Sequence, residues 1–158
     1  MKQSGFRTEK GFTLIELLLV IGIISVLAVV VFVALDPAKR FADARDARRN
    51  SDVQNILSAI HQYIIDNKGA LPSGLGTTEN QIGTATSGCG LVAGECNVGA
   101  TACLDMSANL AKYLKSIPTD PQNGTAGTTH YSVQTDVNGI VTVRACDTEG
   151  TTAISISR

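Results

Sequence analysis

The hydrophobic residues change their pattern along the chain. From Phe12 to Leu35 almost every position is apolar, and Glu16 is the only charged residue in this block. From residue 38 to 68 apolar residues recur at helical spacing, and after residue 129 they alternate with polar residues in short runs. This order predicts a long apolar helix, then an amphipathic helix, then a small β-sheet.

The apolar block is long enough to cross a membrane. As a helix it would measure about 36 Å, and the hydrocarbon core of a bilayer is about 30 Å thick. The remaining chain is too small to wrap such a helix, which argues against a buried core helix. The alternative is a secretory signal peptide, whose apolar region of roughly 7–15 residues ends in a small-residue cleavage site. Here the block is longer, and Asp36-Pro37 leads straight into the next helical pattern.

The charges around the block give its expected orientation. Lys2, Arg7 and Lys10 precede it and predict a cytoplasmic N-terminus. Cations also follow the block closely, from Lys39 onwards, so the charge argument for this orientation is a weak one.

The amphipathic pattern predicts that the helix continues from about residue 38 to residue 67. The segment Asn67-Lys68-Gly69 is a stop signal, with Pro72 beyond it. Pro37 is expected to kink the helix just outside the membrane. The apolar positions that share one helical face are Val53, Ile56, Leu57, Ile60, Tyr63 and Ile64.

A long polar segment separates this helix from the next predicted element. Residues 70–103 are rich in Gly, Thr and Ser and read as a loop. Residues 104–117 have apolar side chains near helical spacing and predict a short helix that ends at Pro118. The sequence IPTDPQNG that follows is a cluster of turn residues.

The C-terminal part predicts three strands. The runs HYSVQT and IVTVRAC flank the turn residues Asn138-Gly139, which is a strong hairpin signal, and TTAISIS supplies the third strand. An antiparallel sheet laid on the helix would bury Ile56, Ile60 and Ile64. The predicted fold class is therefore α+β, with a long N-terminal helix, half transmembrane and half amphipathic, packed on a small three-stranded antiparallel sheet.

The cysteine count predicts a disulfide-stapled head. The chain has four cysteines, all after residue 88, and only two aromatic residues lie in that part, so its core must be small. We expect pairs Cys89–Cys96 and Cys103–Cys146, since the first closes a short loop and the second a long one worth roughly 4 kcal/mol. Zinc is the less favoured alternative, because the spacings lack a short C-x-x-C hook.

Composition and motifs give no sign of catalysis or of a cofactor. The net charge is −1, and acidic neighbours weaken the positive potential around Arg45, Arg48 and Arg49, so nucleic-acid binding is not favoured. His61 is expected to be solvated or at a subunit contact, and His130 begins a strand; neither has a catalytic partner nearby. No small-molecule substrate is indicated. Residues that could in principle offer oxygen ligands to calcium, but without the spacing of a calcium loop, are Asp120, Asp136, Asn138 and Asp147.

Glu16 is the most informative residue of the apolar block. A carboxylate in hydrocarbon costs about 2.5–3.5 kcal/mol on insertion scales, although near a helix end it can reach the interface. If the chain is cut after Gly11, Phe12 gains a free amine one helical turn from Glu16. The same amine on a neighbouring copy could pair with this carboxylate and set the register between two chains.

The sequence GFTLIELLLVIGII resembles the type IV prepilin signature, a short basic leader followed by Gly, Phe and an apolar run with Glu at the fifth mature position. The resemblance implies cleavage between Gly11 and Phe12 by a prepilin peptidase, N-methylation of Phe12, and pairing of Glu16 with a neighbour's N-terminus. Many family members carry a Pro inside the apolar run. This sequence departs from that pattern, because Gly22 and Ser25 are the only residues in the run that weaken a helix.

The resulting domain plan is a leader at 1–11, a transmembrane or filament-core helix at 12–36, an amphipathic helix at 37–68 and a disulfide-bearing head at 69–158. The resemblance implies a type IV pilin that polymerises with itself, with an assembly ATPase and a platform protein as partners. It would be a single-pass inner-membrane precursor with its N-terminus in the cytoplasm and then part of an extracellular pilus. The alternatives are a pseudopilin of a type II secretion system and a membrane-anchored binding domain that never polymerises.

Overall fold

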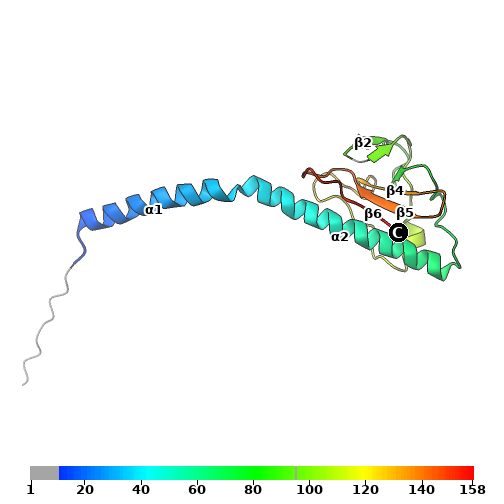
Figure 1. Ribbon diagram of the computed structural model, residues 1–158, viewed down its shortest axis with the longest axis horizontal. Coiled ribbons are helices and arrows are strands. Elements are labelled where there is room, and N and C mark those ends of the chain that lie inside the picture. Colours follow the sequence, from blue (N-terminus) through cyan, green and yellow to red (C-terminus); the bar gives the residue numbers. More distant parts are fainter. Residues whose placement is uncertain (1–10, 95) are drawn as a thin grey trace, which may run out of the picture. The chain divides into compact units, whose positions relative to one another are not determined.

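The computed structural model describes residues 11–94 and 96–158 (Figure 1). The chain divides into two compact units, Met1–Arg40 and Phe41–Arg158. The leader expected at residues 1–11 lies outside the described residues except for Gly11.

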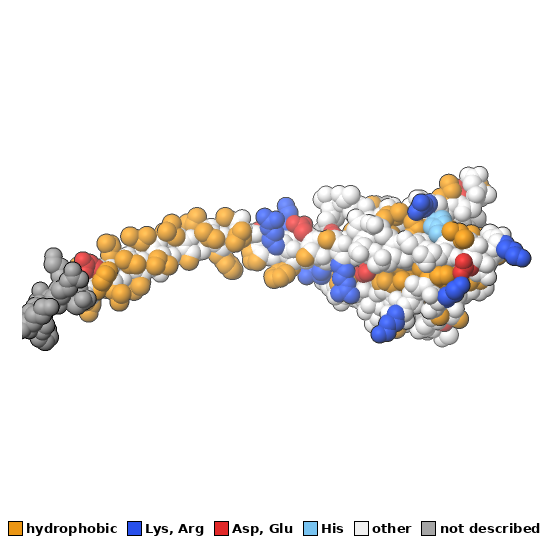
Figure 2. Space-filling view, turned by 90° about the horizontal axis from the view of Figure 1, so that it is seen from below, with side chains coloured by type: hydrophobic (Ala, Val, Ile, Leu, Met, Phe, Trp, Pro, Cys, Tyr) orange, Lys and Arg blue, Asp and Glu red, His pale blue; other side chains and the backbone are white. Residues whose placement is uncertain are grey.

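The first unit is built on helix α1, Leu14–Leu35. None of its side chains is buried within the chain, and it presents an apolar surface along its length in Figure 2. The helix runs without interruption through Gly22 and Ser25, and the Ser25 hydroxyl donates to the Ile21 carbonyl at 2.7 Å. The helical stretch Leu14–Asp66 meets the length and composition required to cross a membrane, which by itself is also true of a signal sequence.

The helix is interrupted at the position expected from Pro37. Asp36 ends α1 in the left-handed conformation, at φ 38° and ψ 74°, and Pro37 begins α2, Pro37–Asp66. A residue before proline is disfavoured in the right-handed helical region, which explains why the break falls on Asp36. The Asp36 carboxylate accepts the backbone N–H of Lys39 at 3.4 Å and so caps the new helix.

The second unit packs α2 against a four-stranded antiparallel sheet, in the order β1-β4-β5-β6. The hairpin of β4 and β5 pairs Val133 with Val143, and β6 pairs Ile156 with the same Val143. The bounds are β1 Asn80–Gln81, β4 Tyr131–Thr135, β5 Val141–Ala145 and β6 Ser155–Ser157. The α+β class with a long helix on an antiparallel sheet is confirmed, but the expected number of three strands is wrong. Strand β1 has two residues, too few to show an alternating pattern.

The main core lies between α2 and this sheet. Ile56 and Ile60 are fully buried, as predicted, whereas Ile64 is only partly buried. The core's other fully buried large side chains come from α2, from α3, from the loops before β4 and from the strands: Val53, Leu110, Ile82, Met106, Tyr131, Val133 and Val141.

The predicted helix over 104–117 is much shorter than expected. Only Ser107–Leu110 form α3, and turns follow it. The Asp105 carboxylate accepts the backbone N–H of Ser107 at 2.9 Å, which starts the helix after Asp105. After Leu110 the chain turns, and the N–H groups of Tyr113 and Leu114 both bond to the Leu110 carbonyl at 2.9 Å.

The predicted polar loop contains a second, two-stranded sheet. Strands β2, Leu91–Ala93, and β3, Cys96–Val98, form an antiparallel hairpin. Its apolar cluster is separate from the main core and consists of Cys96, Val98 and Cys146 with Leu91 and Ala100 at its edge.

Both disulfides are present, but the expected pairing is wrong. The pairs are Cys89–Cys103, with Cα atoms 5.1 Å apart, and Cys96–Cys146, at 5.3 Å. Because β2 and β3 pair antiparallel, the residues before and after the hairpin lie side by side, which brings Cys89 to Cys103. Cys96 lies on the buried face of β3, where it meets Cys146 after β5. The hairpin was not predicted, so spacing alone favoured other pairs.

Candidate functional site

The N-terminal site residues lie at the start of α1. Gly11 and Phe12 precede the helix, and Phe12 is 80% exposed. Glu16 stands in the first helical turn, and its carboxylate accepts the backbone N–H of Thr13 at 2.9 Å and the Thr13 hydroxyl at 2.8 Å. Thr13 Oγ1 in turn accepts the Glu16 N–H at 3.3 Å, which completes a capping box.

This geometry satisfies the polar groups of α1 locally and leaves an apolar cylinder. Glu16 is bonded to Thr13, and Ser25 is bonded back to Ile21. The rest of the helical surface is aliphatic or aromatic, and burying such a surface in lipid or in a bundle of like helices is favourable. The Glu16 carboxylate remains exposed at the helix end and can meet a cation from outside the chain.

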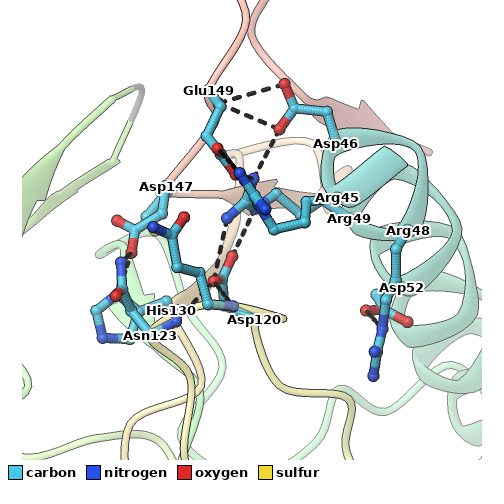
Figure 3. A network of polar contacts seen from close by, with 12 residues as sticks. Arg45, Asp46, Arg48, Arg49, Asp52, Asp120, Asn123, His130, Asp147 and Glu149 are labelled. Atoms are coloured by element: carbon cyan, nitrogen blue, oxygen red, sulfur yellow. Dashed lines mark hydrogen bonds and ion pairs between the residues drawn. The ribbon is translucent and has the colours of Figure 1, made fainter. Parts of the chain in front are cut away.

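The head contains a buried ionic cluster that the sequence analysis did not predict (Figure 3). Arg49 on α2 is fully buried and forms a two-pronged pair with Asp120, Nε to Oδ2 at 2.6 Å and Nη2 to Oδ1 at 3.1 Å. Its Nη1 donates to Asp46 and to Glu149, each at 2.8 Å. Arg45 also donates to Glu149, from Nε at 2.6 Å. The sequence contained one signal for a buried arginine, because Arg49 lies on the same helical face as the apolar positions 53, 56 and 60.

The cluster shifts the ionisation of its members. Burial lowers the pKa of Arg49, but hydrogen bonds to Asp120, Glu149 and Asp46 outweigh it and raise the pKa. Burial likewise raises the pKa of Asp120, but the bond from Arg49 and backbone N–H groups outweigh it and leave the pKa lowered. Hydrogen bonds from Arg45 and then Arg49 lower the pKa of Glu149 to about 2.

The other candidates of the sequence analysis are dispersed. Among the three arginines considered for nucleic acid, Arg45 and Arg49 are engaged by carboxylates, and Arg48 is largely exposed with Asp52 at 3.7 Å. His61 is partly buried, and its Nε2 has no hydrogen-bond partner within the described residues. His130 has φ 61° and its Nδ1 lies 2.8 Å from Asp147 Oδ2.

The four calcium candidates do not converge on one site. Asp120 is held by Arg49, Asp147 accepts the side-chain amide of Asn123 at 2.6 Å, and Asp136 and Asn138 bond each other in the β4–β5 turn. Across residues 11–94 and 96–158, no group of three or more His, Cys, Asp or Glu side chains is placed to hold a metal ion.

These features define an α+β protein with a prepilin-type N-terminus. Residues 6–32 match the family described as the prokaryotic N-terminal methylation motif, so the predicted resemblance to prepilin-type proteins is confirmed. The chain is also similar to the type II secretion system core protein G of Pectobacterium carotovorum subsp. carotovorum, at 43% identity over 65 residues. That match covers 41% of this chain and 40% of the relative, so the chain spans well under half of that protein's length. No solved structure shows a significant match.

Proposed function

We propose that this chain is the structural subunit of a helical filament assembled from prepilin-type copies of itself. The observation that carries the proposal is α1, which is apolar over its length and buries none of its side chains within the chain. Such a surface needs a bilayer before assembly and a bundle of equivalent helices afterwards. In this proposal the transmembrane segment at 12–36 faces lipid before assembly and forms the filament core afterwards. The amphipathic helix at 37–68 supports the head, and the head at 69–158 faces outward.

In this proposal a prepilin peptidase cuts between Gly11 and Phe12, and the new Phe12 amine is methylated. Glu16 pairs with the Phe12 amine of a neighbouring subunit, which removes the cost of an unpaired carboxylate in apolar surroundings. The exposed position of Phe12 and the helix-end position of Glu16 support this pairing. The precursor is held in the inner membrane with its N-terminus in the cytoplasm, and an assembly ATPase with a platform protein extracts it.

The experiment has two parts, one on the native chain and one on two variants of the full-length chain. Mass spectrometry of the first peptide should find it beginning at a methylated Phe12. The variant Glu16→Ala should still be processed but should form few filaments, whereas Ser25→Ala should assemble normally because its hydroxyl is bonded within its own helix. A chain that keeps residues 1–11, or a Glu16→Ala variant that assembles like the parent, would contradict the proposal. If the parent chain forms no filaments and Glu16→Ala does not differ from it, the result would favour a membrane-anchored domain that never polymerises.

Of the two kinds of filament, we propose a type IV pilus as the first candidate. The head carries a loop closed by Cys89–Cys103, and its hairpin exposes 82% of Val92, as a surface sheath would allow. A type II secretion pseudopilus is the second candidate, favoured by the similarity to core protein G. Filaments sheared from the cell surface that contain this chain would support the pilus; a secretion defect on deletion, without such filaments, would support the pseudopilus.

The role proposed is structural and not catalytic, and no cofactor or small-molecule substrate forms part of it. Turnover of a substrate by the purified chain would contradict this assignment. Binding of the filament to nucleic acid is not part of the proposal, because two of the three candidate arginines are engaged internally.

A further inference from the structure

The β2–β3 hairpin is a structural unit of its own within the head. Among the described residues its strands pair with each other and not with the four-stranded sheet, and its apolar cluster is separate from the main core. A two-stranded hairpin is marginally stable by itself in water. Something outside the hairpin must therefore hold it in place.

The hairpin is held mainly at Cys146. The Cys96–Cys146 disulfide joins β3 covalently to the residue after β5. Gly94, at φ 55°, lies so close to the Cys146 carbonyl that a Cβ atom there would come within 2.5 Å of its oxygen. Two weaker contacts reach β4 and its neighbour Glu79. Cys96 Sγ lies 3.1 Å from Ser132 Oγ, and the Asn97 N–H donates at 3.1 Å to Glu79, which also accepts the Ser132 hydroxyl.

Residues 146–150, here named the C-terminal strap, are in turn fixed to α2. Glu149 accepts from Arg45 and Arg49, and the Asp46 carboxylate accepts the backbone N–H groups of Glu149, at 3.2 Å, and of Gly150, at 2.8 Å (Figure 3). The Cys146 N–H donates to the His130 carbonyl at 3.0 Å, and the Asp147 carboxylate accepts the side-chain amide of Asn123 at 2.6 Å. The hairpin thus reaches the helix through one disulfide and a few residues of strap.

We propose that the hairpin and the C-terminal strap open together as one local unit, latched by the Cys96–Cys146 disulfide and by Glu149, while α2 and the four-stranded sheet stay folded. Local opening of this kind follows cooperative units with few buried apolar contacts, and the cluster under the hairpin is small. The inference concerns the head alone and does not depend on filament formation.

The proposal makes the hairpin sensitive to thiols. An external dithiol would reduce the disulfide by exchange, so that Cys96 and Cys146 each gain a hydrogen and the dithiol becomes a cyclic disulfide. Reduction would then release the hairpin surface and leave the main core intact. Both sulfurs are buried in the closed unit, so reduction would follow opening of the strap.

Hydrogen exchange on the full-length chain in detergent micelles tests the proposal. In Cys96→Ala/Cys146→Ala and in Glu149→Gln, amides of β2 and β3 should exchange at least about tenfold faster than in the parent, with β4 and β5 amides unchanged. The matched control is Asp66→Asn at the end of α2, which removes the carboxylate charge that meets Lys112 and Tyr113 and should leave the hairpin unaffected.

Three results would overturn the proposal. Exchange of β4 and β5 that rises in step with the hairpin would mean that the head opens only as a whole. An unchanged hairpin in both variants would mean that neither latch holds it, and acceleration in the cysteine variant alone would exclude Glu149 from the latch. If the cysteine variant fails to fold, Glu149→Gln compared with Asp66→Asn decides the matter.

Discussion

The guanidinium of Arg49 and the carboxylate of Asp120 form a bidentate salt bridge, and both side chains are fully buried. The two residues lie 71 positions apart in the sequence. Asp120 lies in the IPTDPQNG turn, where its carboxylate also accepts the N–H groups of Gln122 and Asn123 at 2.8 and 3.0 Å. One ion pair therefore both shapes this turn and fixes it to α2.

Removing the cation of this pair should destabilise the head strongly. In Arg49→Met the side chain keeps much of its volume, but Asp120 is left buried without its partner, and breaking a buried pair in this way costs about 3–5 kcal/mol. The neighbouring Arg48→Met removes a largely exposed arginine and should change the free energy of unfolding by less than about 0.5 kcal/mol. Urea unfolding of the full-length chain in detergent, followed by tyrosine fluorescence, measures both. Equal effects of the two substitutions would contradict the role given to Arg49.

The same cluster predicts that the head loses stability in acid. The pKa values of Asp120 and Glu149 are lowered in the folded state, so both carboxylates favour folding fully at pH values above their unfolded pKa, about 4. This contribution is lost as pH falls through the folded values, which for Glu149 is about 2. The urea midpoint should therefore be flat from pH 7 to 5 and fall between about pH 5 and 2. Glu149→Gln should show a shallower fall, and an identical pH profile would contradict the assignment.

Helical periodicity and strand alternation were sufficient to predict α2 and the β4–β5 hairpin, because both elements bury one continuous face. They could not predict β1 or the β2–β3 hairpin. Asn80–Gln81 is too short for a pattern, and Leu91–Val98 lies among Gly and Ala residues, where the alternation is weak. The disulfide pairing depended on that hairpin and was missed with it.

The ionic cluster was missed for another reason. Arg45, Asp46 and Arg49 lie in a stretch of mixed charge, and such stretches usually form a solvated helix face. Their partners Asp120 and Glu149 are far away in the sequence, and only the folded head brings them together. The N-terminal site differs because Gly11, Phe12 and Glu16 are neighbours in sequence, so their motif needs no tertiary structure to be recognised.

Two isoleucines of α2 provide a matched test of the core. Ile60 is fully buried between the helix and the sheet, whereas Ile65 is 76% exposed on the same helix. Ile60→Ala removes buried methyl groups and leaves a cavity, so unfolding free energy should fall by about 2–5 kcal/mol. Ile65→Ala should change it by less than about 0.5 kcal/mol in the same urea measurement. A large loss at Ile65 in this assay would show that its side chain is covered in the detergent-solubilised chain.

Gly124 should also stabilise the turn that holds Asp120, by less than the ion pair does. A Cβ atom at Gly124 would lie 2.2 Å from the backbone nitrogen of Asp120 and 2.9 Å from its carbonyl oxygen, and backbone atoms cannot move aside cheaply. Gly124→Ala should therefore force the turn open and cost about 1–3 kcal/mol. No atom of the described residues lies within 4 Å of the Cβ position at Gly99, so Gly99→Ala should be neutral or slightly stabilising, because it restricts the unfolded chain. Urea unfolding compares the two variants. If Gly124→Ala acts by displacing Asp120, it should also flatten the acid-dependent loss of stability, whereas a variant with the parent's pH profile would place the damage elsewhere in the turn.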